Sequence, residues 1–225
     1  MSANVIAIDG PAASGKSTVA SHLARLLSIP YVNTGSMYRA VTYAVLENKI
    51  DYNDPSAMAE LLDSIKLDYS ADDEGNFSLS LNGRFLKDEL VTPEVNAAVS
   101  PVAAVVAVRE KLKTLQRSLA EKQMIVMEGR DIGSVVFPDA KWKFFVTASP
   151  EVRARRRLDQ SKESYSSATL EEIAKSIAER DRIDSERPVA PLKQCEDAIL
   201  VDSSDMNVEE TVAFIAERVR KNGIF

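Results

Sequence analysis

The sequence predicts an α/β fold in which helices flank a five-stranded parallel sheet that carries a small antiparallel β insertion. Short apolar runs alternate with helical patterns, which is typical of parallel strands joined by helical crossovers. One segment instead alternates apolar and polar residues with period two, as half-buried antiparallel strands do. The length of 225 residues suits one large domain with an insertion.

Five short apolar runs predict buried parallel strands over residues 4–9, 29–34, 124–128, 143–147 and 198–202. The helix after the first strand places four apolar residues on one face: Val19, Leu23, Leu26 and Leu27. A second helix, 35–47, follows the second strand, and a long helix pair is predicted over 92–122.

Capping signals mark the helices in the last third of the chain. Ser149 is a suitable N-cap after the fourth strand, with Pro150 at the first helical position. Thr169 and Glu172 have the spacing of a capping box. The last helix carries an apolar stripe over 208–219.

The inserted segment, 65–91, breaks the strand–helix alternation. Phe77, Leu79 and Leu81 share one side of a strand, and Asn82-Gly83 is a strong hairpin turn. We therefore predict a single domain, 1–225, with a core of 1–64, 93–150 and 188–225 and an insertion of about 65–92.

Composition excludes several classes of protein. The chain is 45% hydrophobic, and it lacks both a signal-type N-terminus and an apolar run of about 18 residues, so we expect a cytoplasmic protein with no membrane partner. Cys195 is the only cysteine, which excludes an internal disulfide and a cysteine-rich metal site. The net charge of −6 argues against a nucleic acid polymer as partner. We expect a monomer.

The strongest motif is the G-x-x-x-x-G-K-[ST] pattern of Gly10 to Ser17, placed between a strand and a helix. Bare backbone amides and a helix N-terminus bind phosphate there, and the lysine adds a mobile charge. The motif predicts an ATP site with Mg²⁺ held at Ser17. Its predicted residues are Gly10, Pro11, Ala12, Ala13, Ser14, Gly15, Lys16, Ser17 and Thr18.

Two short patterns resemble guanine-nucleotide motifs but occur in the wrong context. "NKID" (48–51) and "DDEG" (72–75) stand in the reverse of the order found in GTPases, and neither follows a buried strand. We therefore exclude a GTPase.

Three stretches place arginines where a second phosphate could bind. They are "NTGSMYRA" with Arg39, "MEGRDIGSVVF" with Arg130 and Asp131, and "ERDRIDSER" with Arg180, Asp184 and Arg187. The first two follow strands, at the edge where open α/β sheets bind ligands. Taken singly, each has a plain alternative: a helix-surface arginine, a charged turn, or a solvated helix face. Together beside a phosphate loop they favour phosphoryl transfer.

With these motifs the chain resembles the bacterial cytidylate kinases, which are nucleoside monophosphate kinases with the P-loop NTPase fold. The resemblance lies in "IDGPAASGKST", "NTGSMYRA", "EVNAAVSPVAAVVAVRE", "MEGRDIGSVVFPDA" and "ERDRIDSERPVAPL", in this order and spacing. It implies a P-loop kinase that phosphorylates CMP and dCMP with ATP and Mg²⁺ in pyrimidine nucleotide metabolism. It also implies a monophosphate-binding role for the insertion and a helical lid over about 151–187.

The resemblance also implies residue roles. Arg39, Arg130 and Arg187 would hold the CMP phosphate, and Thr34 would line its pocket. Ser100, Arg109 and Asp131 would read the cytosine edge, while Arg180 and Asp184 would contact the sugar. The CMP-binding set is Thr34, Arg39, Ser100, Arg109, Gly129, Arg130, Asp131, Arg180, Asp184 and Arg187. The catalytic set is Lys16, Arg130, Arg153, Arg157 and Arg187; the lid arginines are ambiguous in register because of the run "RARRR".

Two alternatives remain at the level of sequence. The chain could be another small-molecule P-loop kinase, acting on adenylate, thymidylate or shikimate. It could instead be a regulatory nucleotide-binding module without turnover. His22, the only histidine, lies on the helix after the loop, and we expect no histidine acid–base catalysis.

Overall fold

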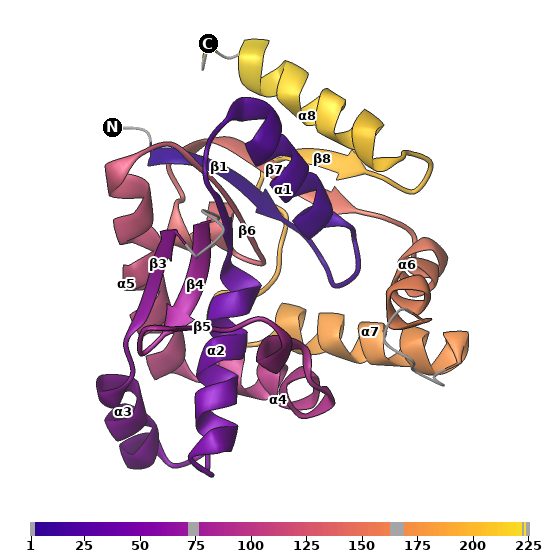
Figure 1. Cartoon of the computed structure of the whole chain (residues 1–225). Helices are drawn as coiled ribbons and strands as arrows, with labels where there is room; N and C mark the ends of the chain where they lie inside the picture. Colours follow the sequence, from indigo (N-terminus) through magenta and orange to yellow (C-terminus); the bar gives the residue numbers. More distant parts are fainter. Residues whose placement is uncertain (1–2, 72–76, 163–168, 222, 224–225) are drawn as a thin grey trace. The chain divides into compact units, whose positions relative to one another are not determined.

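The computed structural model describes residues 3–71, 77–162, 169–221 and 223 (Figure 1). These form two compact units. The first comprises Met1–Tyr31 and Ala120–Phe225, and the second comprises Val32–Leu119. We describe each unit by itself.

A five-stranded parallel sheet is present, as predicted; four of its strands lie in the first unit, and β2 begins at Tyr31, the last residue of that unit's first segment. Its order is β2-β6-β1-β7-β8, with bounds β1 Ala3–Asp9, β2 Tyr31–Asn33, β6 Ile125–Gly129, β7 Ala140–Thr147 and β8 Ile199–Asp202. The central strand β1 pairs in parallel with β6 on one side and β7 on the other. The chain leaves β1 toward β2 and leaves β7 toward β8, so the strand order reverses between β1 and β7. Open α/β sheets bind ligands at such a point, beyond the carboxyl ends of the strands.

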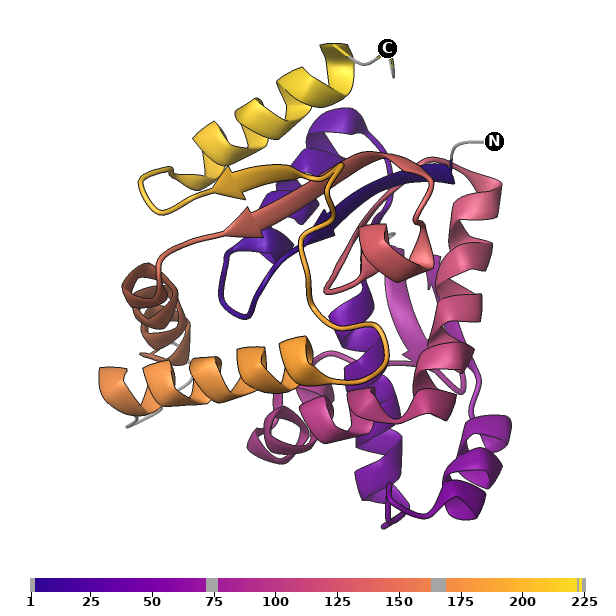
Figure 2. The same cartoon turned by 180° about the vertical axis from the view of Figure 1, so that it is seen from behind.

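Two helices, α1 (Lys16–Leu27) and α8 (Val208–Lys221), pack together against this sheet (Figures 1 and 2). Their apolar stripes join the sheet residues in one buried core. Leu23 and Ile215 are fully buried there, together with Phe144 of β7. This core anchors the end of β1 and the start of α1, which flank the predicted ATP loop.

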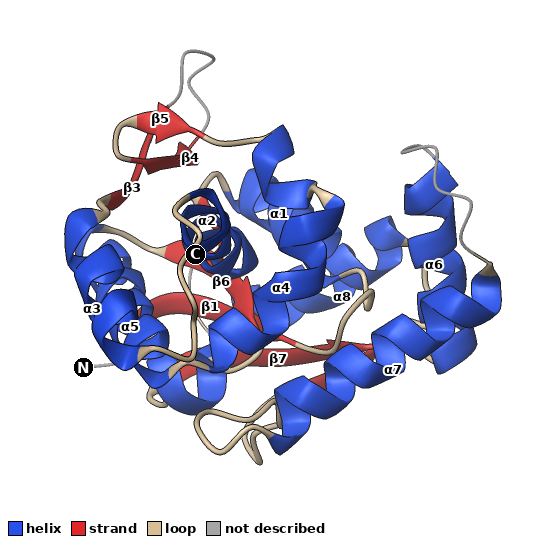
Figure 3. Ribbon diagram, turned by 90° about the horizontal axis from the view of Figure 1, so that it is seen from below, coloured by secondary structure: helices blue, strands red, loops and turns tan. Residues whose placement is uncertain are grey.

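The helices α6 (Pro150–Lys162) and α7 (Leu170–Glu186) contact each other after β7 (Figure 3). The predicted caps are present: the Val152 amide donates to Ser149 Oγ at 3.3 Å, and Thr169 forms a reciprocal capping box with Glu172. Ile173 and Ile177 of α7 pack with Ala154 of α6. Between β6 and β7 lies one π-helical turn, η2 (Ile132–Val136), which the sequence did not predict.

The second unit contains the predicted small antiparallel sheet, which has three strands, and the predicted helix pair. The sheet order is β3 (Leu67–Ala71), β4 (Phe77–Leu81) and β5 (Arg84–Phe85). Asn82 and Gly83 both have positive φ, 51° and 80°, as a two-residue hairpin turn requires. The remaining elements are α2 (Thr34–Glu47), α3 (Pro55–Ser64), η1 (Asp88–Val91), α4 (Pro93–Ala104) and α5 (Val106–Lys122).

Some details differ from the sequence predictions. The strand expected over 29–34 covers only Tyr31–Asn33, because the Asn33 side chain accepts the Ser36 amide and α2 already begins at Thr34. Helix α3 was not predicted, although Asp54 caps it and Pro55 is its first residue. "NKID" does lie at a helix end, and "DDEG" lies outside the described residues. None of the described helices is long and apolar enough to cross a bilayer.

Candidate functional site

The phosphate loop between β1 and α1 adopts a shape that depends on its glycines. A Cβ on Gly10 would lie 2.0 Å from the carbonyl oxygen of Val146 in β7, so a side chain does not fit there. Gly15 has φ 85° and is the N-cap of α1, while Ala13 also has a positive φ of 57°. The loop therefore turns back over the N-terminus of α1, which carries partial positive charge.

Lys16 is buried at the first position of α1, and its Nζ donates a hydrogen bond to the Pro11 carbonyl oxygen at 2.9 Å. Burial, followed by the positive charge of Arg130, lowers the pKa of the ammonium from 10.5 to about 7, and Glu128 partly opposes this shift. A buried cation that lies beside other cations is stabilised in its charged form when an anion binds next to it.

Ser17 and Glu128 form a pair of hard oxygen groups next to the loop. Ser17 Oγ donates to Glu128 Oε1 at 2.8 Å, and the Tyr31 hydroxyl donates to the same oxygen at 3.2 Å. Glu128 is buried in β6. A hydroxyl and a carboxylate are ligands that suit Mg²⁺. Ser17 was predicted from the sequence, whereas Glu128 was given no role, although it lies within the stretch "MEGRDIGSVVF".

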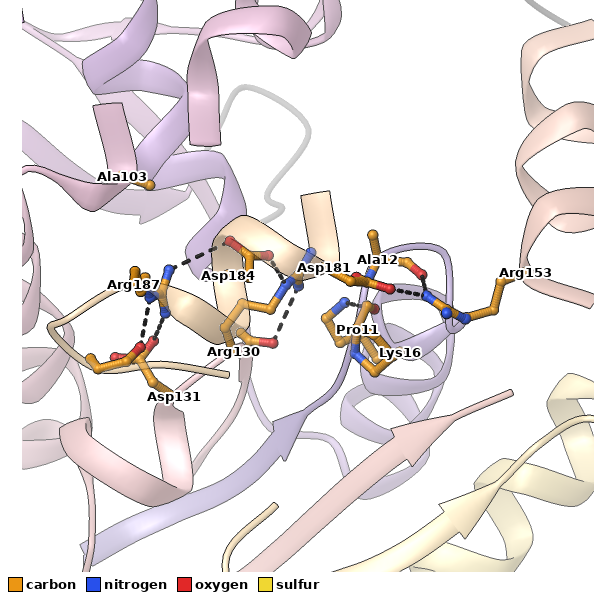
Figure 4. Close-up of polar contacts among 12 residues, drawn as sticks. Pro11, Ala12, Lys16, Ala103, Arg130, Asp131, Arg153, Asp181, Asp184 and Arg187 are labelled. Atoms are coloured by element: carbon orange, nitrogen blue, oxygen red, sulfur yellow. Dashed lines mark hydrogen bonds and ion pairs between the residues drawn. The ribbon is translucent and has the colours of Figure 1, made fainter. Parts of the chain in front are cut away.

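Helices α6 and α7 jointly hold the top of the loop at Ala12 (Figure 4). The Ala12 amide donates to Asp181 Oδ1 at 2.9 Å, and Arg153 Nη1 donates to the Ala12 carbonyl oxygen at 3.1 Å. Arg153 also forms an ion pair with Asp181 Oδ2. The backbone amide of Ala12 is therefore bound by α7, and its carbonyl oxygen is bound by α6.

A second arginine of α6 holds the other side of the loop. Arg156 Nη1 donates to the Ser14 carbonyl oxygen at 3.1 Å and to Ser203 Oγ at 3.0 Å, while its Nη2 donates to the Ser203 carbonyl oxygen at 2.7 Å. The predicted lid arginines were Arg153 and Arg157. Arg156 takes the second loop contact, and the role of Arg157 stays a prediction.

Four predicted residues of the first unit form one charged cluster (Figure 4). Arg130 Nε lies 2.8 Å from Asp184 Oδ2, and Arg187 lies 3.6 Å from both Asp184 Oδ1 and Asp131 Oδ1. Arg187 Nε also donates to the Ala190 carbonyl oxygen at 2.7 Å. The side chains are at most 17% exposed, so this cluster concentrates charge in a poorly solvated place.

Asp184 stays ionised in this cluster, because its pKa is lowered. Burial raises its pKa, but Arg130, Arg180 and Arg187 together lower the pKa by more, so the net shift is downward. Asp184 stands on α7 three residues after Asp181. The same helix therefore touches the phosphate loop with one carboxylate and the arginine cluster with the other.

Four predicted residues belong to the second unit: Thr34, Arg39, Ser100 and Arg109. Arg39 Nη1 donates to the Leu90 carbonyl oxygen and to Asn96 Oδ1, both at 2.8 Å. Arg109 is buried, donates to the Ala103 carbonyl oxygen at 3.0 Å and lies over the Tyr38 ring at 5.4 Å.

Two further predicted residues complete this group. Thr34 is buried at the start of α2, and Ser100 is half-buried on α4. Sequence reasoning missed Tyr38 and Asn96, which were quoted inside motifs without a role.

Comparisons of the sequence with known proteins point to a single family. The sequence profile of the cytidylate kinase family matches residues 6–221. A cytidylate kinase of Clostridium botulinum (strain Loch Maree / Type A3) is 46% identical over 217 residues, covering 96% of this chain and 98% of that protein. A cytidylate kinase of Caldanaerobacter subterraneus subsp. tengcongensis is also 46% identical, covering 96% and 95%.

Among solved structures, an uncharacterized protein from Eubacterium ventriosum superposes with a TM-score of 0.55 at 16% identity. It covers 96% of this chain and 98% of its own, and this likeness concerns the fold alone.

Proposed function

The chain belongs to the cytidylate kinase family, and from that premise we propose that its phosphate loop binds ATP while its arginine cluster binds the phosphate of CMP. The reaction is the ATP-dependent phosphorylation of CMP, which gives CDP and ADP. The observation that carries the assignment of sites is α7, which contacts the loop through Asp181 and the cluster through Asp184.

The donor site consists of Gly10–Thr18 with the arginines that touch it. Two buried polar atoms beside this loop, Ser14 Oγ and Arg153 Nε, have no hydrogen-bond partner within the described part of the chain. Buried polar groups without partners are costly, and phosphate oxygens are suitable acceptors for both. Lys16 exchanges its bond to the Pro11 carbonyl oxygen for a triphosphate oxygen.

The residues present fit a magnesium ion bound with ATP. Ser17 supplies a hydroxyl and Glu128 a carboxylate, 2.8 Å apart. When bound, the ion neutralises charge on the triphosphate oxygens. The Tyr31 hydroxyl orients Glu128 by donating to the carboxylate oxygen that Ser17 also uses.

The acceptor site uses the guanidinium groups of Arg130, which is half-buried, and Arg187, which is buried. A guanidinium pairs bidentately with phosphate oxygens, and burial strengthens that attraction. Asp184 keeps both arginines oriented until CMP binds. Arg180 and Asp184 also remain our candidates for the sugar hydroxyls, because both stand on the α7 face that carries the cluster.

Recognition of the base falls to Asp131 in the first unit. Cytosine presents an amino donor next to acceptors, and a buried carboxylate accepts from that amino group. In the second unit, Ser100 and Arg109 are proposed for the same edge, with Thr34 and Arg39 for the phosphate. dCMP is proposed as a second acceptor.

The chemistry needs no dedicated base, because the CMP phosphate is already ionised at neutral pH. One of its oxygens attacks the γ-phosphorus in line, and the bond to the β–γ bridging oxygen breaks to release ADP. Lys16 and the arginines stabilise the charge that spreads over the transferred group. Arg153 stands on the helical segment proposed as a lid, where closure would exclude water from the reaction.

A coupled assay of ADP release with CMP, dCMP, UMP, AMP and dTMP tests this proposal. We expect CMP and dCMP to be the preferred acceptors. Preference for AMP or dTMP would overturn the acceptor site. Nucleotide binding without CMP-dependent ADP release would indicate a regulatory module instead.

A further inference from the structure

Asp9, the last residue of β1, joins the end of the central strand to a distant loop. It directly precedes the phosphate loop and is 5% exposed. Its Oδ1 accepts the Ile132 amide at 2.8 Å, and its Oδ2 accepts the Gly133 amide at 2.7 Å. Asp9 is not among the residues proposed to bind either nucleotide.

The two amides are the first of the π-helical turn η2, where backbone donors have no partner within the turn. Asp131 is the N-cap of η2, but its side chain makes no capping bond. Its carbonyl oxygen instead accepts the amides of Val135 and Val136 at 2.9 and 3.1 Å. The peptide group between Asp131 and Ile132 is therefore held at both ends, by η2 on the oxygen side and by Asp9 on the nitrogen side.

Gly133 allows this close approach. A Cβ on Gly133 would lie 3.4 Å from Asp9 Oδ2 and 3.2 Å from Cγ and Cδ of Lys143. The Lys143 side chain has little freedom to move aside, because it is buried and its ammonium lies 2.7 Å from Asp197 Oδ2. The carboxylate, the glycine and the lysine stem thus fill the space around the start of η2.

A carboxylate is better suited than an amide to this position. It accepts both backbone donors with negative oxygens, whereas an asparagine would face one of them with its own NH₂ group. Burial raises the pKa of Asp9 to about 7, the two amides oppose that shift, Asp131 adds to it and Lys16 reduces it. The pKa of Asp9 therefore depends on a charge in the phosphate loop, that of Lys16, and on a charge in the segment after β6, that of Asp131.

We propose that Asp9 is a positioning residue for base selection, because it fixes the peptide that aims Asp131. The inference rests on the proposed role of Asp131 in reading cytosine. Asp9 itself touches neither nucleotide in this proposal. The phosphate loop has separate supports, namely Asp181 at Ala12 and Arg156 at Ser14, so its geometry does not depend on Asp9 alone.

The test compares Asp9→Asn with the unchanged protein for CMP, UMP and ATP. Loss of a charged hydrogen bond costs roughly ten- to a hundred-fold in an equilibrium. We expect the KM for CMP to rise about ten-fold, and the ratio of kcat/KM for CMP to that for UMP to fall by a similar factor. The KM for ATP should stay within about two-fold. Equal increases in the KM for CMP and the KM for ATP would mean a general structural role and would overturn the proposal.

Gly133→Ala provides a second variant if Asp9→Asn does not fold. It keeps the carboxylate but places a methyl group 3.2 Å from the Lys143 side chain, which disturbs the start of η2. The CMP to UMP ratio should therefore fall in the same direction; an unchanged ratio in the folded variant contradicts the inference. Ser134→Ala is the matched control in the same turn, because Ser134 Oγ has no hydrogen-bond partner among the described residues. It should leave the ratio unchanged.

Asp131→Asn separates this inference from the proposed function. If Asp131→Asn lowers the ratio and Asp9→Asn does not, base reading by Asp131 stands and the role of Asp9 is wrong. If Asp131→Asn itself leaves the ratio unchanged, base reading by Asp131 fails and the positioning role fails with it.

Discussion

At the scale of a residue, Lys16 links nucleotide binding to pH. Its pKa in the ligand-free protein is about 7, so much of it is neutral slightly above that pH. A bound triphosphate adds negative charge and raises the pKa again. We predict that ATP binding takes up about half a proton near pH 7 and close to one near pH 8, and little below pH 6, where Lys16 is already charged.

Calorimetry in buffers of different ionisation enthalpy measures this uptake. Asp9→Asn is the control, because Asp9 also has a pKa near 7 but its removal leaves Lys16 in place. Uptake that disappears in this variant would assign the proton to Asp9 and refute the role of Lys16.

Lys16→Ala should remove most phosphoryl transfer while the fold survives. The ammonium is buried and, among the described residues, its hydrogen bond is to the Pro11 carbonyl oxygen, so its loss removes charge compensation without breaking a core contact. A rate of ADP release below one hundredth of the original, from a protein with a normal circular dichroism spectrum, is the expected outcome. Near-normal turnover would contradict the donor site.

At the scale of an element, α7 is the helix that contacts both proposed nucleotide sites. Asp181→Ala removes the partner of the Ala12 amide and of Arg153, so the loop loses its upper anchor. We predict that the KM for ATP rises about ten-fold, with a smaller effect on the KM for CMP. Steady-state kinetics with each substrate varied in turn will measure both.

Glu179→Gln is the matched control on the same helix, because among the described residues Glu179 forms its ion pair with the exposed Arg182. If Asp181 and Arg153 hold Ala12 together, the effects of Asp181→Ala and Arg153→Ala should not add in the double variant. Additive effects would contradict this joint role.

The N-terminus of α7 makes a separate prediction about stability. Thr169→Ala removes the capping box with Glu172, and such caps contribute about 1 kcal/mol. We expect a melting temperature lower by roughly 2–4 °C with KM values unchanged. A thermal melt with parallel kinetics distinguishes this loss from an effect on the clamp.

Elements and motifs with local signals could be predicted from sequence. The glycine–lysine pattern, the Asn82-Gly83 turn and the Thr169–Glu172 box are each read within a few residues, and the structure contains all three features. Asp181 binds Ala12 across 169 residues and Asp9 binds Gly133 across 124, so no local pattern could pair them. The choice between Arg156 and Arg157 depended on helix rotation, which "RARRR" leaves open.

At the scale of the whole molecule, the two nucleotides should stabilise the protein independently. A ligand at about 100 times its Kd adds roughly 2.7 kcal/mol, which is several degrees in melting temperature for a chain of this size. We predict that Arg187→Lys loses most of the shift caused by CMP and keeps the shift caused by ATP, because a lysine cannot reproduce the bidentate fork.

Differential scanning fluorimetry with each nucleotide alone measures these shifts. Lysine rather than alanine keeps a charge beside Asp131 and Asp184, so the two buried carboxylates are not left without a cation. If the CMP shift persists in full, Arg187 does not hold the acceptor phosphate.

The spacing of the two carboxylates on α7 acts as a ruler. Three residues of a helix advance about 4.5 Å and stay near one face, so the backbone itself sets how far apart the two phosphate-binding regions are supported. Inserting a single residue between Asp181 and Asp184 would turn one carboxylate about 100° away from its partner. The number of residues between these two positions therefore couples the proposed donor site to the proposed acceptor site.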